Sequence, residues 1–237
     1  MFGKSAMVYD AIYRSQEKDY RAESAAITSL VLDRAPHART LLDVGCSTGG
    51  HLEHLRERFT CSGLDIAEEL LEVARHRFPA GIDFHQGDMA DFDLGTQFDA
   101  VTCLFSSIGY VRTYDRLAAT ARCFARHVAP GGVVIVEPWI TTEAWQDESR
   151  AYITVAEEEE IQAVRIMFRH REGRLNKLDL QYLVATDGKI EHLVEEHQLG
   201  LFDFDEYVRA FAGAGFAVEL DREGLIGRGL IVGQLPA

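Results

Sequence analysis

The sequence predicts an α/β fold, a doubly wound parallel sheet with an inserted antiparallel β subdomain. Through residue 136, short apolar runs alternate with amphipathic segments, as in a parallel sheet covered by helices. Over residues 151–201 the helical spacing is replaced by extended runs between Gly-containing turns, which is typical of an antiparallel meander. We therefore expect an N-terminal helical lid (1–36), an α/β core (37–150), the inserted sheet (151–201) and a C-terminal helix with an antiparallel strand pair that completes the core (202–237).

Two helices are predicted before the first strand. A short one carries Tyr9, Ile12 and Tyr13 on one face, and a longer one runs from about 19 to 33. On the longer helix the residues expected to face inward are Ala22, Ala26, Leu30 and Val31. Because this segment precedes the first strand, it is placed to lie across the mouth of a site as a lid.

Five core strands are predicted, at 40–44, 62–66, 82–86, 98–104 and 133–136. The helices expected between them cover about 49–59, 67–78 and 114–127. In the insert, extended runs occupy 162–170, 174–185 and 191–201. A last helix over 204–214, begun by a cap at Asp203 or Asp205, precedes strands at 217–220 and 229–232, which pair antiparallel because their loop is short.

Composition excludes several classes of function. Lys and Arg number 24 and Asp and Glu 38, so the net charge is −14 and no basic stripe is present. We therefore expect no nucleic-acid partner, although one or two arginines can still hold a small phosphorylated substrate. No apolar run approaches the ~20 residues of a membrane span, and the first residues lack a signal-peptide pattern, so we expect a cytoplasmic protein. The four cysteines show no metal-ligand spacing, and we expect them buried and no metal bound.

The first predicted strand runs into the turn Gly45-x-x-x-Gly49-Gly50, where backbone groups can approach a nucleotide-like ligand closely. Its spacing is not the G-x-G-x-x-G of a dinucleotide fold. Asp65 follows at the end of the second strand, where a carboxylate can accept hydrogen bonds from both ribose hydroxyls. The alternative for Asp65 is an N-cap of the helix that begins near Ala67.

A third element, Gly87-Asp88-Met89, follows the third strand. Asp88 can accept from the exocyclic amine of an adenine, with Met89 against the ring. A turn aspartate is the alternative. The three elements end three successive strands and so converge on the crevice where open α/β sheets bind ligands.

These residues, with the turn Pro130-Gly131-Gly132, resemble class I S-adenosylmethionine-dependent methyltransferases. The resemblance implies a Rossmann-like seven-stranded sheet and S-adenosylmethionine as the cofactor. The cofactor-binding residues that it implies are Tyr20, Asp43, Gly45, Cys46, Ser47, Gly49, Asp65, Ile66, Asp88, Met89 and Leu104.

A narrower resemblance rests on Lys18-Asp19-Tyr20, the segments 85–89, 101–103 and 105–110, Val136-Glu137-Pro138-Trp139 and Gly227-Arg228-Gly229-Leu230. These segments are similar to the dTDP-3-amino-deoxysugar N,N-dimethyltransferases of macrolide sugar pathways, such as the desosamine and mycaminose enzymes. That family also carries an inserted antiparallel sheet. This chain departs from it at Gly45 and Ser47, which stand where the family has Ala and Gly.

Methyl transfer to an amine depends mainly on positioning and water exclusion. We expect Tyr110 and Tyr13 to be catalytic, with Tyr110 orienting the amine or relaying its proton to solvent; a packed aromatic is the alternative for each. Arg228, between two glycines, suits a diphosphate. The substrate-binding residues expected are Tyr9, Ser107, Glu137, Trp139 and Arg228.

The function expected is S-adenosylmethionine-dependent N-methylation, performed twice, of the amine of a nucleotide-linked amino deoxysugar in natural-product (antibiotic) biosynthesis. One alternative is N- or O-methylation of another small metabolite. A more distant one is a nicotinamide-dependent oxidoreductase with a degenerate turn. The inserted sheet is expected either to mediate a homodimer or to roof the site.

Overall fold

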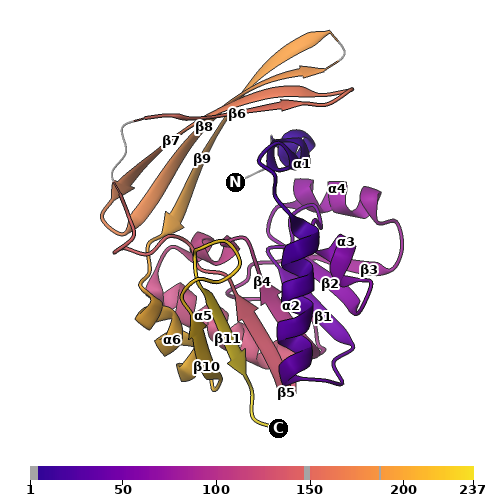
Figure 1. The fold of residues 1–237 in the computed structure, drawn as a ribbon, viewed down its shortest axis with the longest axis vertical. Coiled ribbons are helices and arrows are strands. Elements are labelled where there is room, and N and C mark those ends of the chain that lie inside the picture. The colour runs from indigo at the N-terminus through magenta and orange to yellow at the C-terminus, as the bar shows by residue number, and fades with distance from the viewer. Residues whose placement is uncertain (1–4, 147–149, 187) are drawn as a thin grey trace.

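Two sheets organise the computed structural model, which describes residues 5–146, 150–186 and 188–237 (Figure 1). In spatial order the seven-stranded sheet consists of β10 (Ala217–Asp221), β11 (Leu230–Gln234), β5 (Val128–Val136), β4 (Phe98–Cys103), β1 (Thr40–Val44), β2 (Thr60–Asp65) and β3 (Ile82–Gln86). β11 runs antiparallel to β10 and β5, and the other neighbours pair in parallel. The predicted seven-stranded sheet with its antiparallel C-terminal pair is confirmed.

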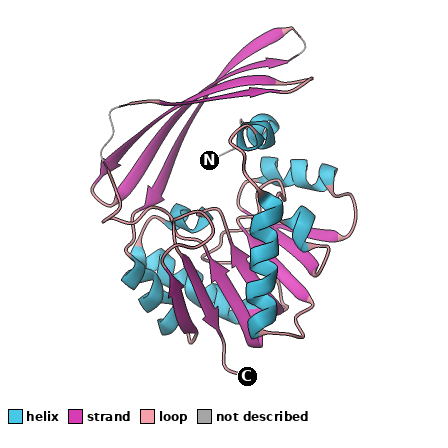
Figure 2. Cartoon of the chain, in the orientation of Figure 1, coloured by secondary structure: helices cyan, strands magenta, loops and turns pink. Residues whose placement is uncertain are grey.

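Helices cover both faces of this sheet (Figure 2). One layer holds α5 (Tyr114–His127) and α6 (Phe204–Gly213), and the other holds α2 (Tyr20–Arg34), α3 (Leu52–Leu55) and α4 (Glu68–Arg77). Successive strand residues point to opposite faces, so Leu42 and Val134 pack against the α5/α6 layer while Leu41 and Val133 pack against the other. This double burial is why the central strands are almost wholly apolar.

The inward face of α2 differs from the prediction. Asp19 caps the helix by accepting from the Ala22 N–H at 2.8 Å. Ala22 itself is exposed, Ala26 and Leu30 are only half-buried, and Val31 is buried as expected. The buried positions include Glu23, which the apolar pattern could not indicate because its burial depends on partners elsewhere in the chain.

α3 is much shorter than the predicted 49–59. After Leu55 the chain continues in turns with hydrogen bonds from Glu57 to His54 and from Arg58 to Leu55, which are three residues apart. These tight turns still bring Phe59 into the core beside Leu55. The apolar spacing therefore predicted the buried residues correctly and the length of the helix wrongly.

The second sheet is antiparallel, in the order β6 (Tyr152–Glu157), β7 (Gln162–Glu172), β8 (Leu175–Thr186) and β9 (Lys189–Gly200). Its inner face packs on α1 (Tyr9–Arg14) and on the 3-10 helix η1 (Ala6–Val8). Figure 1 shows it reaching over the carboxyl edge of the main sheet, with α1 beneath it. The inserted antiparallel sheet was predicted, but its edge strand β6 was not among the runs identified.

At the C-terminal end the predicted cap is confirmed. Asp203 and Glu206 form a capping box at the start of α6. The Asp203 side chain accepts from the backbone N–H of Glu206, and the Glu206 side chain accepts from the backbone N–H of Asp203. No helix of the described residues is long and apolar enough to cross a membrane. Within the same residues, no group of three or more His, Cys, Asp or Glu is arranged to hold a metal ion, and the four cysteines are free and buried.

Candidate active site

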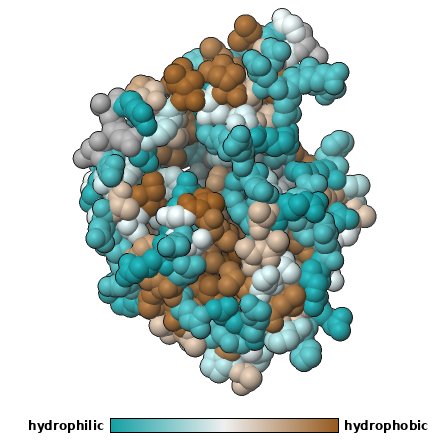
Figure 3. Space-filling view, viewed as in Figure 1, coloured by the Kyte–Doolittle hydropathy of each residue, from teal (hydrophilic) through white to brown (hydrophobic). Residues whose placement is uncertain are grey.

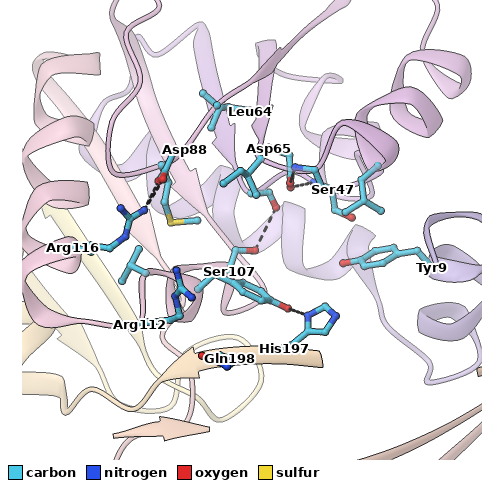
Figure 4. Close-up of a pocket in the computed structure, with 18 of the residues that line it drawn as sticks. Tyr9, Ser47, Leu64, Asp65, Asp88, Ser107, Arg112, Arg116, His197 and Gln198 are labelled. Carbon is cyan, nitrogen blue, oxygen red and sulfur yellow. Dashed lines mark hydrogen bonds and ion pairs between the residues drawn. The ribbon is translucent and has the colours of Figure 1, made fainter. Parts of the chain in front are cut away.

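A cavity of about 320 Å³ lies at the carboxyl ends of β1, β2 and β3 and extends to β9 of the inserted sheet (Figure 4). Side chains from the N-terminal segment, from three strand ends and from the turn after β4 meet there. The sequence-predicted residues that line it are Tyr9, Gly45, Ser47, Asp65, Ile66, Asp88, Met89, Ser107 and Tyr110. The convergence expected from successive strand ends is therefore present.

The turn after β1 packs tightly against the segment after β4. A Cβ added at Gly45 would lie 2.6 Å from the Cβ of Ser107, and Gly45 has a φ of +75°. Ser47 also has a positive φ, of +53°, which side chains disfavour. Only glycine fits position 45, and this keeps the backbone of the turn open to the cavity.

Asp65 ties this turn to the next helix. Its carboxylate accepts from the Ser47 N–H and from the Ala67 N–H, both at 2.9 Å. Burial raises the pKa of Asp65, and these two hydrogen bonds only partly offset that effect. The helix-capping alternative is wrong, because the N-cap of α4 is Ala67 and no side chain caps that helix; Asp65 bonds to the backbone of the N-cap residue itself and lines the cavity.

Asp88 is held by a charged partner that the sequence did not indicate. The Arg116 guanidinium donates to both carboxylate oxygens, at 2.7 and 2.6 Å, and the Ala90 N–H donates at 2.9 Å. Burial alone would raise the pKa of Asp88, but the bonds from Ala90 and Arg116 lower it overall. An ionised acceptor therefore stands at the end of β3.

The turn after β4 is strained and braced. Phe105 and Ser106 both have positive φ, +50° and +63°, which is uncommon for residues other than glycine. The buried Glu137 accepts from the Phe105 N–H at 2.6 Å, and the Ser106 hydroxyl donates to the Pro138 carbonyl at 2.7 Å. These contacts from the end of β5 hold the turn in a conformation that it would not adopt alone.

Tyr110 connects the main domain to the inserted sheet. Its hydroxyl lies 2.7 Å from Nδ1 of His197 on β9 (Figure 4). Burial raises the pKa of Tyr110 well above its usual value and lowers that of His197, so both groups are neutral near pH 7.

A second, more basic cluster lies beside the cavity. Nη1 of Arg228 donates to the Ser106 hydroxyl at 3.0 Å, and its guanidinium lies 4.8 Å from the Trp139 ring centroid. Nζ of Lys18 lies 3.8 Å from the Phe105 ring centroid and 2.5 Å from a Glu23 oxygen. Burial lowers the pKa of both Lys18 and Arg228, which marks them as partly desolvated cations.

Comparison with known proteins adds the reaction to this geometry. A family model described as "Methyltransferase domain" matches residues 41–132. The chain is 43% identical over 230 residues to the dTDP-3-amino-3,4,6-trideoxy-alpha-D-glucopyranose N,N-dimethyltransferase of Streptomyces venezuelae, covering 96% of each protein. The chain belongs to the class I S-adenosylmethionine-dependent methyltransferases, in the dTDP-amino sugar N,N-dimethyltransferase family. The nicotinamide-dependent oxidoreductase is thereby excluded.

Solved structures agree with this assignment. The crystal structure of Streptomyces venezuelae DesVI matches with a TM-score of 0.92 at 42% identity and covers 99% of both chains. The SAM-bound structure of CalS10, an amino pentose methyltransferase from Micromonospora echinaspora involved in calicheamicin biosynthesis, matches with a TM-score of 0.85 at 38% identity, covering 96% of both chains. S-adenosylmethionine is the cofactor of this methyltransferase.

The cavity fits that cofactor. The turn at Gly45 leaves room beside the backbone that any Cβ would fill, and an acidic side chain ends each of β2 and β3. Asp65 suits the hydroxyls of a ribose, and Asp88 suits an exocyclic amine. These two contacts stay predictions for the methyltransferase.

Five other predicted cofactor-binding residues lie outside the cavity lining and serve the structure around it. Asp43 is buried and accepts from the Thr102 hydroxyl at 2.7 Å. Cys46 is packed against Gly63, Leu104 is in the core, and the ring of Tyr20 lies against Gly50 and His51. Gly49 has a φ of +82°, and a Cβ there would lie 2.8 Å from Phe78. Contact between these five residues and the cofactor stays a prediction, and none of them is among the residues that line the cavity.

Four predicted catalytic or substrate residues, Tyr13, Glu137, Trp139 and Arg228, lie in the basic cluster and not in the lining of the cavity. The Tyr13 ring contacts Tyr9 at 4.6 Å and Phe105 at 5.0 Å between centroids. The cluster therefore adjoins the cavity through Tyr9 and the strained turn at 105–106.

Sequence reasoning missed Arg112, Arg116, His197 and Gln198, which also line the cavity. Arg116 carried no signal, since a basic residue in the first turn of a helix is ordinary on a surface. The position of His197 in the sequence did give a partial signal of a functional role. His197 alternates with Glu195 and Leu199 on the apolar face of a predicted strand, where a histidine needs a partner.

Proposed function

We propose that this methyltransferase dimethylates the amine of a dTDP-linked amino deoxysugar. The observation that carries the proposal is the half-buried Arg228, hydrogen-bonded to Ser106 and stacked on Trp139, in a chain whose net charge is −14. Lys18 is paired with Glu23, whereas the hydrogen bond of Arg228 goes to the neutral Ser106 hydroxyl, so the Arg228 guanidinium is the group in this cluster suited to bind an anion. A diphosphate matches the fork of a guanidinium.

The basic cluster also has the right position for such an acceptor. Lys18 and Arg228 lie over the Phe105 ring, and Tyr13 contacts the same ring. Tyr9, which contacts Tyr13, lines the cofactor cavity. A nucleotide held on the basic side would extend its sugar toward the cavity. Its amine would then lie near Tyr110, which lines the cavity.

The cofactor supplies an electrophilic methyl group. The chain's own part is to orient the amine, to keep it deprotonated and to exclude water. Tyr9, Tyr13 and Tyr110 form an aromatic wall for this purpose. We infer that the inserted sheet and α1 act as the roof and lid, because the inner face of that sheet packs on α1 above the cavity.

The proposal is tested by turnover. The enzyme is incubated with S-adenosylmethionine and a panel of dTDP-linked 3-amino and 4-amino deoxysugars, and products are followed by mass spectrometry. We expect a transient product of +14 Da and a final one of +28 Da on at least one sugar. The same amino sugars without the nucleotide are the control, and we expect them to react at least 100-fold more slowly per unit concentration. Equal rates with and without the nucleotide, or no methylation of any member, would reject the proposal.

A homodimer through the outer face of the inserted sheet is a further part of the proposal. Ile153, Val155, Phe168, Leu183 and Val194 are all exposed there, and Val155, Val164 and Leu183 are neighbours across β6, β7 and β8. Figure 3 shows apolar side chains gathered over this sheet. A patch of this kind on a monomer is unusual, and two copies can bury it by packing sheet on sheet.

The dimer is tested by light scattering after size-exclusion chromatography. Val155→Glu with Leu183→Glu should convert a dimer to a monomer, whereas Ile226→Glu, at an exposed site elsewhere, should leave it dimeric. A monomeric wild type at micromolar concentration contradicts the dimer.

We also propose a cytoplasmic location, because four free cysteines suit a reducing compartment.

A further inference from the structure

A line of hydrogen-bonding groups leads from the cavity into the inserted sheet. The Tyr110 hydroxyl lies 2.7 Å from Nδ1 of His197, and Nε2 of His197 lies 3.4 Å from Oε2 of Glu195. Glu195 in turn accepts from the N–H of Ser5 at 3.0 Å and from its hydroxyl at 2.8 Å. The side chains of His197 and Glu195 are 0% and 3% exposed. A buried polar line of this kind is costly unless it is used or fully satisfied.

We propose that Tyr110, His197 and Glu195 form a proton relay that deprotonates the acceptor amine before each methyl transfer. The relay rests on the proposed N-methyltransferase function and goes beyond it. Tyr110 is the catalytic residue, because it lines the cavity; His197 receives the proton through it, and Glu195 is a positioning residue.

The chemistry needs such a relay twice in one dimethylation. Alkyl amines are largely protonated at neutral pH, and an ammonium has no lone pair with which to displace the sulfonium. After the first transfer the product is a secondary ammonium, which must lose a proton before it can accept a second methyl. Enzymes that methylate an amine once face this demand only once.

Atoms and charges balance in each cycle. An N–H bond of the ammonium breaks and its proton passes to the Tyr110 oxygen, while the Tyr110 O–H proton passes to Nδ1 of His197. The result is a neutral amine, a neutral phenol and an imidazolium. The His197 side chain is 0% exposed, so once the methylated product has left, the imidazolium returns its proton through the Tyr110 hydroxyl to water in the cavity before the next cycle.

The tautomer that the relay requires is set by the neighbours of His197. For Tyr110 to donate to Nδ1, the ring proton must be on Nε2, which faces Glu195. A carboxylate at this position holds the ring orientation and stabilises the imidazolium that forms, as in serine hydrolases. Burial would raise the pKa of Glu195, but hydrogen bonds from His197 and Ser5 lower it overall, so the carboxylate is ionised.

Other charged groups nearby leave His197 neutral at rest. Burial lowers its pKa, Glu195 opposes this, and Arg165 on β7 lowers it again. The groups that face Tyr110 are Tyr13 on α1, Tyr182 on β8, Asp65 on β2 and Glu195, and with burial they raise its pKa. Tyr110 therefore passes a proton on without remaining a phenolate.

Ser5 links the relay to the N-terminal segment. It is buried, and both of its donors reach Glu195 across 190 positions of sequence. Both carboxylate oxygens of Glu195 accept from Ser5 when Ser5, the residue before η1, is docked on β9. Proton transfer is thereby tied to a closed site.

Kinetics distinguish a relay from a merely structural pair. His197→Gln should lower kcat at pH 7 on the order of 10²-fold, with the KM for S-adenosylmethionine unchanged. The acid limb of its kcat–pH profile should move to higher pH by at least about one unit, and products should accumulate at +14 Da. Glu195→Gln should show the same changes with a smaller loss, about 10-fold. His192→Gln, on the same strand but exposed and bonded to Gln181, is the matched control and should match wild type.

A variant that is slower but keeps the wild-type pH profile and the wild-type ratio of mono- to dimethyl product would overturn the relay. A second measurement does not depend on the acceptor. In ¹⁵N NMR of the enzyme with S-adenosylhomocysteine, the His197 signals, assigned by their loss in His197→Gln, should show an unprotonated Nδ1. A protonated Nδ1 would overturn the relay, even if every dTDP-amino sugar is methylated. A failure to methylate any of these sugars would instead reject the proposed function.

Discussion

The Arg228 guanidinium donates to the Ser106 hydroxyl at 3.0 Å, and Ser106 is held at a φ of +63°. The bond joins the loop before β11 to the strained turn after β4. Because Ser106 also donates to the Pro138 carbonyl, the ends of β4 and β5 and the last loop are fixed to one another at this point. The positive charge of Arg228 is therefore held in one place at the edge of the cofactor cavity.

Replacement of the Arg228 charge should weaken binding of the acceptor sugar and leave binding of the cofactor unchanged. Arg228→Gln is expected to raise the KM for a dTDP-linked amino sugar by about 10- to 100-fold, the value of one or two charged hydrogen bonds. The Kd for S-adenosylhomocysteine should stay within twofold. Arg222→Gln, whose guanidinium stacks on Phe204 in the same loop region, is the control and should change neither constant. A large loss of cofactor affinity in Arg228→Gln would show that the residue acts on the cavity as a whole.

Asp65 should decide cofactor affinity. Asp65→Asn is expected to weaken S-adenosylhomocysteine binding by at least about 10-fold, because one amide group cannot accept from Ser47, Ala67 and two ribose hydroxyls together. Calorimetry provides the measurement. Asp83→Asn, at an exposed position of β3, should bind like wild type. Unchanged affinity in Asp65→Asn would mean that this carboxylate serves only the turn.

The sequence predicted the site residues that lie at strand ends, and it missed the site residues whose roles depend on pairing with a side chain far away in the sequence. Asp65 and Asp88 were identified because parallel strands end at one edge, a rule that needs only strand order. Arg116 and His197 were missed because their roles come from pairing with Asp88 and Tyr110, which lie 28 and 87 positions away. Those pairs form only when α5 and the inserted sheet are docked.

The same reason explains the error in α2. A buried glutamate is stable there because Lys18 and His51 both bond to its carboxylate, and the hydropathy of a single helix does not contain that information. The length of α3 depends in a similar way on how Phe59 packs on the core, which the helical spacing of Leu52 and Leu55 does not determine.

Ser47 offers a test of backbone strain. A non-glycine residue in the left-handed region, such as Ser47, is strained by roughly 1–2 kcal/mol in the folded protein. Substitution by glycine removes this strain, but the greater conformational freedom of glycine in the unfolded chain offsets about half of the gain. Ser47→Gly is therefore expected to raise the free energy of unfolding by about 0.5–1 kcal/mol in urea. Ser62→Gly, in the extended strand β2, should lower it by a similar amount. A destabilised Ser47→Gly would show that the serine hydroxyl outweighs the strain.

Asp43 should give stability an unusual pH dependence. Burial raises its pKa from 3.8 to about 6, so the folded protein holds a proton here that the unfolded chain has released. As pH rises from about 4 to 6, this group's contribution to stability falls, by up to about 3 kcal/mol. Asp43→Asn should lack that fall, so its stability relative to wild type should increase with pH across the window. A difference that does not vary with pH would contradict the assignment.

Asp99, near the start of β4, is the control of opposite sign. Burial would raise its pKa, but the N–H groups of Arg39 and Thr40 and the Thr40 hydroxyl lower it overall. Its contribution is present above the usual carboxyl pKa and is lost as pH falls. Asp99→Asn should therefore be less stable than wild type at pH 7, and the two should converge as the solution is acidified.

The central claim is that the acceptor lies between Arg228 and Tyr110. A crystal structure of the enzyme with S-adenosylhomocysteine and a dTDP-linked amino sugar tests it most directly. We expect the diphosphate on the Arg228 guanidinium and the sugar nitrogen within hydrogen-bonding distance of the Tyr110 hydroxyl, facing the sulfur. A nucleotide bound elsewhere, with the sugar nitrogen turned away from Tyr110, would contradict the account.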